Sequence, residues 1–223
     1  MNLSALHRRL LADVISIGTA YPLVITGGYA VQAHGLVDRL SQDIDVATEN
    51  PAPMAAIAED LRQGLSHRGW QVTVISVDPL SARLLVTSPD TCEDCEVDVL
   101  KENFWAPPES TEHGPVLAFD DVVGTKVRAL ADRGAVRDLI DVHAAADSHA
   151  LHDLERLGER HGRGEFRLQD LRERLGGAEW FDDDEFAAYG LTPEETEELR
   201  IWAQRWVSDL DQRLTVVADD HDD

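Results

Sequence analysis

Asp43 and Asp45 are the residues of this chain whose type and spacing most directly suggest chemistry. They flank Ile44 at the start of a short apolar run, residues 44–47, which the pattern predicts to be a strand. Residues two apart on a strand point to the same face, so both carboxylates would face outward together. Two like charges this close favour a divalent cation, and carboxylate oxygens are ligands that Mg²⁺ selects. Two aspartates spaced in this way, taken alone, nevertheless more often lie on the solvated face of a strand.

A pair of glycines precedes these acids. Gly27 and Gly28 follow a short buried strand predicted over residues 22–26, and a short helix is predicted over 29–34. At such a junction, backbone N–H groups can contact a phosphate with no side chain in the way. Taken alone, two glycines more often mark a tight turn.

A third acid comes from a later strand. Residues 95–100 alternate apolar and polar side chains, which places Glu96 and Asp98 on one face. A carboxylate from Asp98 beside Asp43 and Asp45 would complete a two-metal site. There, one ion would lower the pKa of an attacking hydroxyl and both would hold the transferring phosphoryl group. By itself, Asp98 is equally compatible with an exposed strand position.

The elements around these residues divide the chain into two parts. Strands are predicted over 22–26, 44–47, 70–77, 82–87 and 95–100, the last two pairing as an antiparallel hairpin, and helices over 2–20, 29–34 and 52–67. Residues 101–115 are predicted to be a loop. Beyond 119 the pattern is helical, over 120–131, 135–147, 151–160, 168–175 and 192–214, and the last helix opens with a Thr-Pro-Glu-Glu capping box. We expect an α+β fold: a small mixed sheet with flanking helices over 1–115, then an all-helical lobe over 116–223, with a cleft between them.

Composition limits the classes of function. The 223 residues contain no apolar stretch long enough to span a membrane, and no signal-peptide pattern, so we expect a cytoplasmic protein. The net charge of −23 argues against broad nucleic-acid affinity, because such a chain repels phosphate backbones. Part of the acidity is predicted to be a solvated tail, formed by Asp219, Asp220, Asp222 and Asp223.

The spacing of the glycines and acids resembles a known superfamily. Gly27-Gly28, fourteen residues, Asp43-Ile44-Asp45 and the later Asp98 are similar to the DNA polymerase β-type nucleotidyltransferases. The narrower stretch Arg39-Leu-Ser41-Gln-Asp43-Ile-Asp45 resembles the AbiEii/AbiGii-type nucleotidyltransferase toxins of bacterial toxin–antitoxin and phage-defence systems. A lysine on a helix followed by an Arg-Asp-x-x-Asp element strengthens this resemblance, which covers roughly residues 20–145. Those later residues are Lys126, Arg133, Arg137, Asp138 and Asp141.

The resemblance implies a set of site residues. The metal ligands would be Asp43, Asp45 and Asp98, holding two Mg²⁺ ions, with Mn²⁺ as an alternative. The NTP phosphates would lie against Gly27, Gly28 and Lys126, a point cation. The remaining nucleotide-site residues would be Arg39, Ser41, Arg133, Arg137, Asp138 and Asp141, of which one acid would hold Lys126 or an arginine in place.

The glycine pair also departs from the superfamily pattern. Many members carry Gly-Ser, so the missing hydroxyl would be supplied here by Thr26, Ser41 or water. Tyr29, which follows the pair, could instead stack on the base.

The implied activity is transfer of NMP from an NTP to an acceptor hydroxyl, with pyrophosphate leaving. The resemblance further implies a growth-inhibiting toxin that acts on an RNA, the 3′ end of tRNA, and is neutralised by an antitoxin protein. Two alternatives stay open. One is a drug-modifying transferase that adenylylates an aminoglycoside, since an acidic protein suits a polycationic acceptor; the other is a non-catalytic module that binds nucleotide or a partner.

Other candidate residues have plainer interpretations. The Cys92-x-x-Cys95 pair has metal-ligand spacing but no second pair to complete a zinc site, so we expect two plain thiols. The five tryptophans are expected to pack in cores or between lobes rather than to stack on nucleic acid: Trp70, Trp105, Trp180, Trp202 and Trp206.

Overall fold

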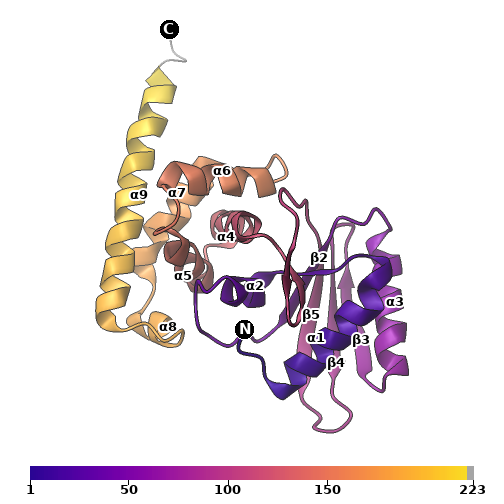
Figure 1. Ribbon diagram of the computed structural model, residues 1–223. Coiled ribbons are helices and arrows are strands. Elements are labelled where there is room, and N and C mark those ends of the chain that lie inside the picture. Colours follow the sequence, from indigo (N-terminus) through magenta and orange to yellow (C-terminus); the bar gives the residue numbers. More distant parts are fainter. Residues whose placement is uncertain (220–223) are drawn as a thin grey trace. The chain divides into compact units, whose positions relative to one another are not determined.

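The computed structural model of this chain describes residues 1–219 (Figure 1). The predicted acidic tail beyond Asp219 lies outside the described residues. The chain divides into two compact units, Met1–Val122 and Val123–Asp223, each with its own buried apolar core. The first unit mixes strands and helices, and the described part of the second contains helices alone, which confirms the predicted α+β class.

A seven-stranded mixed sheet forms the centre of the first unit. The strands are β1 (Val24–Ile25), β2 (Ile44–Thr48), β3 (Gln71–Val77), β4 (Ser81–Thr87), β5 (Asp94–Lys101), β6 (Glu109–Thr111) and β7 (Gly114–Val116). Their order across the sheet is β3-β4-β5-β2-β1-β7-β6. Strand β2 runs parallel to β5, and β1 runs parallel to β7, while the other neighbours are antiparallel. The predicted β4–β5 hairpin is thereby confirmed.

Helices cover the apolar face of this sheet. They are α1 (Ala5–Ile17), the 3₁₀ turn η1 (Gly18–Ala20), α2 (Gly27–Ala33) and α3 (Met54–His67). The Ser4 hydroxyl caps α1 by accepting the His7 N–H at 3.0 Å. Helix α3 packs on β3 and β4 with α1 beside it (Figure 1), because Ile57, Leu61 and Leu65 recur at helical spacing and are fully buried.

Alternation along β5 fixes which side chains enter the core. Cys95, Val97 and Val99 are buried, whereas Glu96 and Asp98 are only partly covered, as the sequence predicts. The parallel register with β2 then sets the acidic residues of the two strands on the same face of the sheet, opposite the core.

The prediction of a loop over 101–115 is wrong in part. Residues 109–111 and 114–116 form the β6–β7 hairpin, and Val116 of β7 pairs with Ile25 of β1. Each strand has three residues, and Pro115 interrupts the second, so neither shows the alternation by which strands are recognised.

The second unit is built from helices α4 to α9. They are α4 (Phe119–Arg133, whose first turn lies in the first unit), α5 (Val136–Ala145), α6 (Leu151–His161), α7 (Leu168–Gly176), the 3₁₀ turn η2 (Gly177–Trp180), α8 (Asp183–Ala187) and α9 (Pro193–Asp219). The predicted capping box opens α9: Thr192 N–H donates to the Glu195 carboxylate at 2.8 Å, and Glu195 N–H donates to the Thr192 hydroxyl at 3.2 Å. Among residues 1–219, no helix combines the length and apolarity that crossing a bilayer requires.

The tryptophans only partly follow expectation. Trp70 and Trp206 are buried, and Trp202 packs edge-on against Trp206 with ring centroids 5.3 Å apart. Trp105 and Trp180 are 56% and 87% exposed, so of the two expected placements the one in a core is wrong for them.

Candidate active site

Two of the three predicted acids are direct neighbours in the sheet. Asp45 on β2 and Asp98 on β5 are register partners on adjacent parallel strands, and Asp43 lies one residue before β2 begins. All three are partly exposed, while Ile44 between the first two is fully buried. The sheet therefore brings Asp43, Asp45 and Asp98 to one face, at the end of β2 where that strand starts.

Gly27 allows the chain after β1 to touch Asp45. A Cβ atom built on Gly27 would lie 1.9 Å from Oδ2 of Asp45, which no side chain could tolerate, and the φ angle of +61° is one that glycine adopts readily. The Thr26 N–H donates to the Asp45 backbone oxygen at 3.0 Å, which fixes the two segments together. The first glycine of the pair thus exists for close approach to the acid.

Gly28 serves Ser41 in the same way. A Cβ atom on Gly28 would lie 2.6 Å from the Ser41 hydroxyl, and that hydroxyl donates to the Asp43 backbone oxygen at 3.1 Å. Arg39, two residues earlier, accepts a hydrogen bond at its backbone oxygen from the Gln32 side chain at 2.5 Å. The segment that leads into the acid pair is therefore anchored on α2.

Tyr29 is not placed to stack on a nucleotide base, the role that its position after the glycines suggested. Its side chain is 1% exposed and its ring packs edge-on against His7, so it has no free face on which a base could stack. The hydroxyl bonds to Nδ1 of His7 and donates weakly to the Ser41 backbone oxygen at 3.4 Å. Burial, together with Cys95 and Asp43, raises the Tyr29 pKa to about 12, so it stays a neutral donor. Tyr29 instead contacts the Ser41 backbone through its hydroxyl.

Arg83 is a residue that the sequence reasoning missed. It lies on β4 as the register partner of Asp98, donates from Nε to Oδ1 at 2.8 Å and from Nη2 to Oδ2 at 2.6 Å, and its Nη1 lies 2.9 Å from Glu96. These contacts, led by the hydrogen bonds to Asp98, raise the pKa of the guanidinium, which is permanently charged. The polar residue at the alternating position of β4 was the available signal.

The two cysteines behave as plain thiols. Both are free, Cys92 exposed and Cys95 buried. Burial, and to a lesser degree the charges of Asp43 and Asp45, raises the Cys95 pKa to about 12, which keeps this thiol neutral. Within residues 1–219, no three His, Cys, Asp or Glu side chains are grouped closely enough to hold a metal ion as they stand.

The second unit contains a buried ionic cluster around Lys126. Its ammonium lies 2.8 Å from Asp141 and 3.6 Å from Asp138, and all three side chains are at most 9% exposed. Arg133 donates two hydrogen bonds to Asp138, at 2.6 and 2.9 Å, from a half-exposed position. Arg137 is partly buried on α5. Helices α4 and α5 thus hold Lys126 rigidly between two carboxylates.

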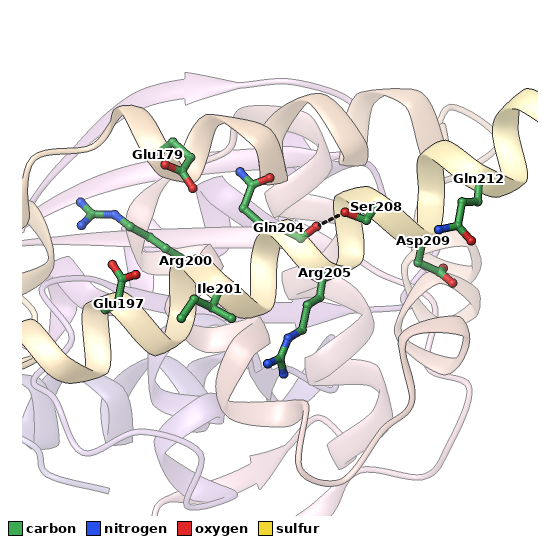
Figure 2. A pocket seen from close by; sticks show the side chains of 9 residues that line it. All are labelled: Glu179, Glu197, Arg200, Ile201, Gln204, Arg205, Ser208, Asp209 and Gln212. Atoms are coloured by element: carbon green, nitrogen blue, oxygen red, sulfur yellow. Dashed lines mark hydrogen bonds between the residues drawn. The ribbon is translucent and has the colours of Figure 1, made fainter.

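A cavity of about 500 Å³ lies along α9 in the second unit (Figure 2). Its nine lining residues include none of the predicted site residues. One of them, Arg200, is engaged in packing, with its guanidinium 5.2 Å from the Phe186 ring centroid. This cavity therefore adds no group to the candidate site.

Comparison with known proteins identifies the family of this chain. The chain belongs to the AbiEii family of nucleotidyl transferase toxins of type IV toxin–antitoxin systems, whose model matches residues 9–214. The chain is therefore a nucleotidyltransferase of a toxin–antitoxin system. Membership implies an antitoxin partner, and the family works with NTP and divalent metal ions.

Solved structures share the fold. The chain is similar to JHP933 from Helicobacter pylori, with a TM-score of 0.57 and 16% identity over 98% of this chain and 99% of that one. It is also similar to MenT4, a nucleotidyltransferase toxin of Mycobacterium tuberculosis H37Rv, with a TM-score of 0.53 and 17% identity over 92% and 91% of the two chains. No curated protein matches the sequence.

Proposed function

We propose that this enzyme transfers NMP from an NTP to an acceptor hydroxyl, with Asp43, Asp45 and Asp98 holding divalent ions, Mg²⁺ in the first place or Mn²⁺. The observation that carries the proposal is the register of Asp45 and Asp98, which sets two carboxylates on neighbouring strands beside a third. Carboxylate oxygens suit these ions, and clustered acids gain from a shared cation. Bound there, the ions would supply Lewis-acid stabilisation of the phosphoryl group and a template for in-line attack.

The chain's own groups would position the triphosphate. The absence of side chains at Gly27 and Gly28 lets Asp45 and Ser41 approach the backbone at the start of α2. The backbone N–H groups of this segment would contact a phosphate oxygen beside these side chains. Lys126 would bring a point cation, held in one orientation by Asp141 and Asp138.

The remaining proposed nucleotide-site residues act through charge or orientation. The guanidinium groups of Arg39 and Arg137 would offer donors to phosphate oxygens. Arg133, whose Nε and Nη2 bond to Asp138, would add positive charge and its remaining N–H groups. Ser41 would orient the backbone segment that leads to Asp43, since its hydroxyl donates to the Asp43 backbone oxygen.

We further propose that the acceptor is the 3′ end of a tRNA in the cytoplasm. A net charge of −23 repels polynucleotides at long range, so binding must be confined to a small end of the acceptor rather than spread over its backbone. The same charge favours a polycationic aminoglycoside, which is the second candidate acceptor.

The test is label transfer from each of the four α-labelled NTPs, with total tRNA, an aminoglycoside or no acceptor. Wild type is compared with Asp43→Ala and with Asp90→Ala, a matched change at an exposed aspartate that pairs with Arg9. We expect labelled tRNA from wild type and Asp90→Ala but not from Asp43→Ala. Labelled aminoglycoside alone would replace the tRNA assignment, and label transfer by Asp43→Ala at the wild-type rate would refute the acid site.

A further inference from the structure

The Arg83–Asp98 pair places a protein cation on one of the three proposed metal ligands. Both oxygens of Asp98 accept from the guanidinium fork, at 2.8 and 2.6 Å. A carboxylate offers about four lone-pair positions, and a fork of this kind occupies one on each oxygen. Asp98 is therefore already charge-paired with Arg83.

The two cations that would bind Asp98 are the Arg83 guanidinium and a divalent ion, and the sheet places them on opposite sides of it. Strand β5 lies between β4, which carries Arg83, and β2, which carries Asp45. Arg83 holds the Asp98 carboxylate from the β4 side, whereas an ion shared with Asp45 would draw it from the β2 side. Because one carboxylate cannot be oriented fully toward both, the arginine and the ion oppose each other.

Glu96 is a second ionic partner of Arg83. Its carboxylate lies 2.9 Å from Nη1 of Arg83, on the side of the guanidinium that Asp98 does not use. The Arg83 side chain is 44% exposed and Asp98 18%, so the pair is open to exchange and weak by the standard of buried pairs. Arg83 can release Asp98 while keeping one ionic partner.

We propose that Arg83 is a resident counter-cation that competes with a divalent ion for Asp98, so that the metal site is completed only when the Arg83–Asp98 pair opens. This inference rests on the proposed function, because it takes Asp98 as a metal ligand. In the absence of metal, Arg83 neutralises an acid that would otherwise repel its neighbours. It acts as a positioning residue, through Asp98.

The experiment is calorimetric titration of Mn²⁺ into the purified full-length protein, wild type and Arg83→Gln, without NTP. Removing the competing cation is expected to tighten Mn²⁺ binding roughly three- to tenfold and to enlarge the rise in unfolding temperature that Mn²⁺ causes. Arg62→Gln is the matched control, since it removes the same charge from an exposed arginine paired to Glu59 at 2.7 Å, and it should leave Mn²⁺ affinity unchanged. Unchanged or weaker binding by Arg83→Gln would overturn the inference, weaker binding meaning that the arginine orients Asp98 for the ion.

Two more variants separate this inference from the proposed function. Arg83→Lys keeps the charge but loses the fork, so its Mn²⁺ affinity is expected between those of wild type and Arg83→Gln. Asp45→Asn should abolish binding. If wild type binds no Mn²⁺, the proposed metal site and the inference fall together. If wild type binds, Asp45→Asn does not, and the two Arg83 variants match wild type, the inference alone fails.

Discussion

Replacing Gly27 by alanine perturbs two roles of this glycine, its backbone conformation and its close contact with Asp45. The added Cβ would lie 1.9 Å from Oδ2 of Asp45, and real contacts of Cβ atoms essentially never fall below 3.0 Å, so the carboxylate must move by at least about 1 Å. A displacement of that size at a reacting centre costs about 10²-fold in rate. The φ angle of +61° adds a conformational cost of about 1–2 kcal/mol, which the stiffer unfolded chain offsets by about 0.4–1 kcal/mol.

Gly35 offers a matched control. Its φ angle is +71°, and a Cβ atom there would meet nothing within 4 Å, so Gly35→Ala carries the same backbone cost without a clash. Both variants should lose on the order of 1 kcal/mol in urea unfolding, the Gly27 variant somewhat more. In label transfer from α-labelled NTP, only Gly27→Ala should fall by about 10²-fold. Equal activity of the two variants would refute the idea that Gly27 is required for its approach to Asp45.

Three further predictions concern stability. Lys126→Met leaves the buried Asp138 and Asp141 without their shared cation and should cost about 3–5 kcal/mol in urea unfolding. Burial lowers the His7 pKa, so the unfolded chain binds this proton more tightly than the folded protein; the unfolding free energy should therefore decline as pH drops below about 6.5, and His7→Gln should flatten that decline. Thr192→Ala removes the N-cap of α9 and should cost about 1 kcal/mol, seen as a lower unfolding temperature.

Each of these has a result that would contradict it. Combining Lys126→Met with Asp141→Asn should recover part of the loss, and a single variant as stable as wild type would mean that the cluster contributes nothing. His67→Gln, at an exposed histidine, is the control for pH, and an identical pH profile for wild type and His7→Gln would contradict the assignment. An unchanged unfolding temperature would remove Thr192 from the helix cap.

Local pattern was enough to predict most elements of the first unit. Strand β5 alternates in polarity and β3 does so over most of its length, while β4 is a short run rich in apolar residues. Helix α3 carries a regular apolar stripe, so local pattern identifies these elements. The β6–β7 hairpin has too few residues for any period. It forms because β7 pairs with the edge of β1 that β2 does not occupy, and this tertiary contact cannot be read from the local sequence pattern.

The sequence singles out candidate residues for the site but does not specify how they pair. That Asp98 is the register neighbour of Asp45 follows only from the order of strands in the sheet. The partnership of Arg83 with Asp98 depends on the register of the β4–β5 hairpin, which a turn of uncertain length does not specify. Tyr29 is buried by His7 of α1, a contact across 22 positions of sequence.

The most direct test of the central claim is a crystal structure of the full chain with Mn²⁺ and a non-hydrolysable NTP, using the anomalous signal of manganese to locate the ions. We predict manganese bonded to carboxylate oxygens of Asp43 and Asp45, with Asp98 turned toward it and the triphosphate beside Gly27. Manganese and triphosphate bound at any other place, with these three carboxylates untouched, would contradict it.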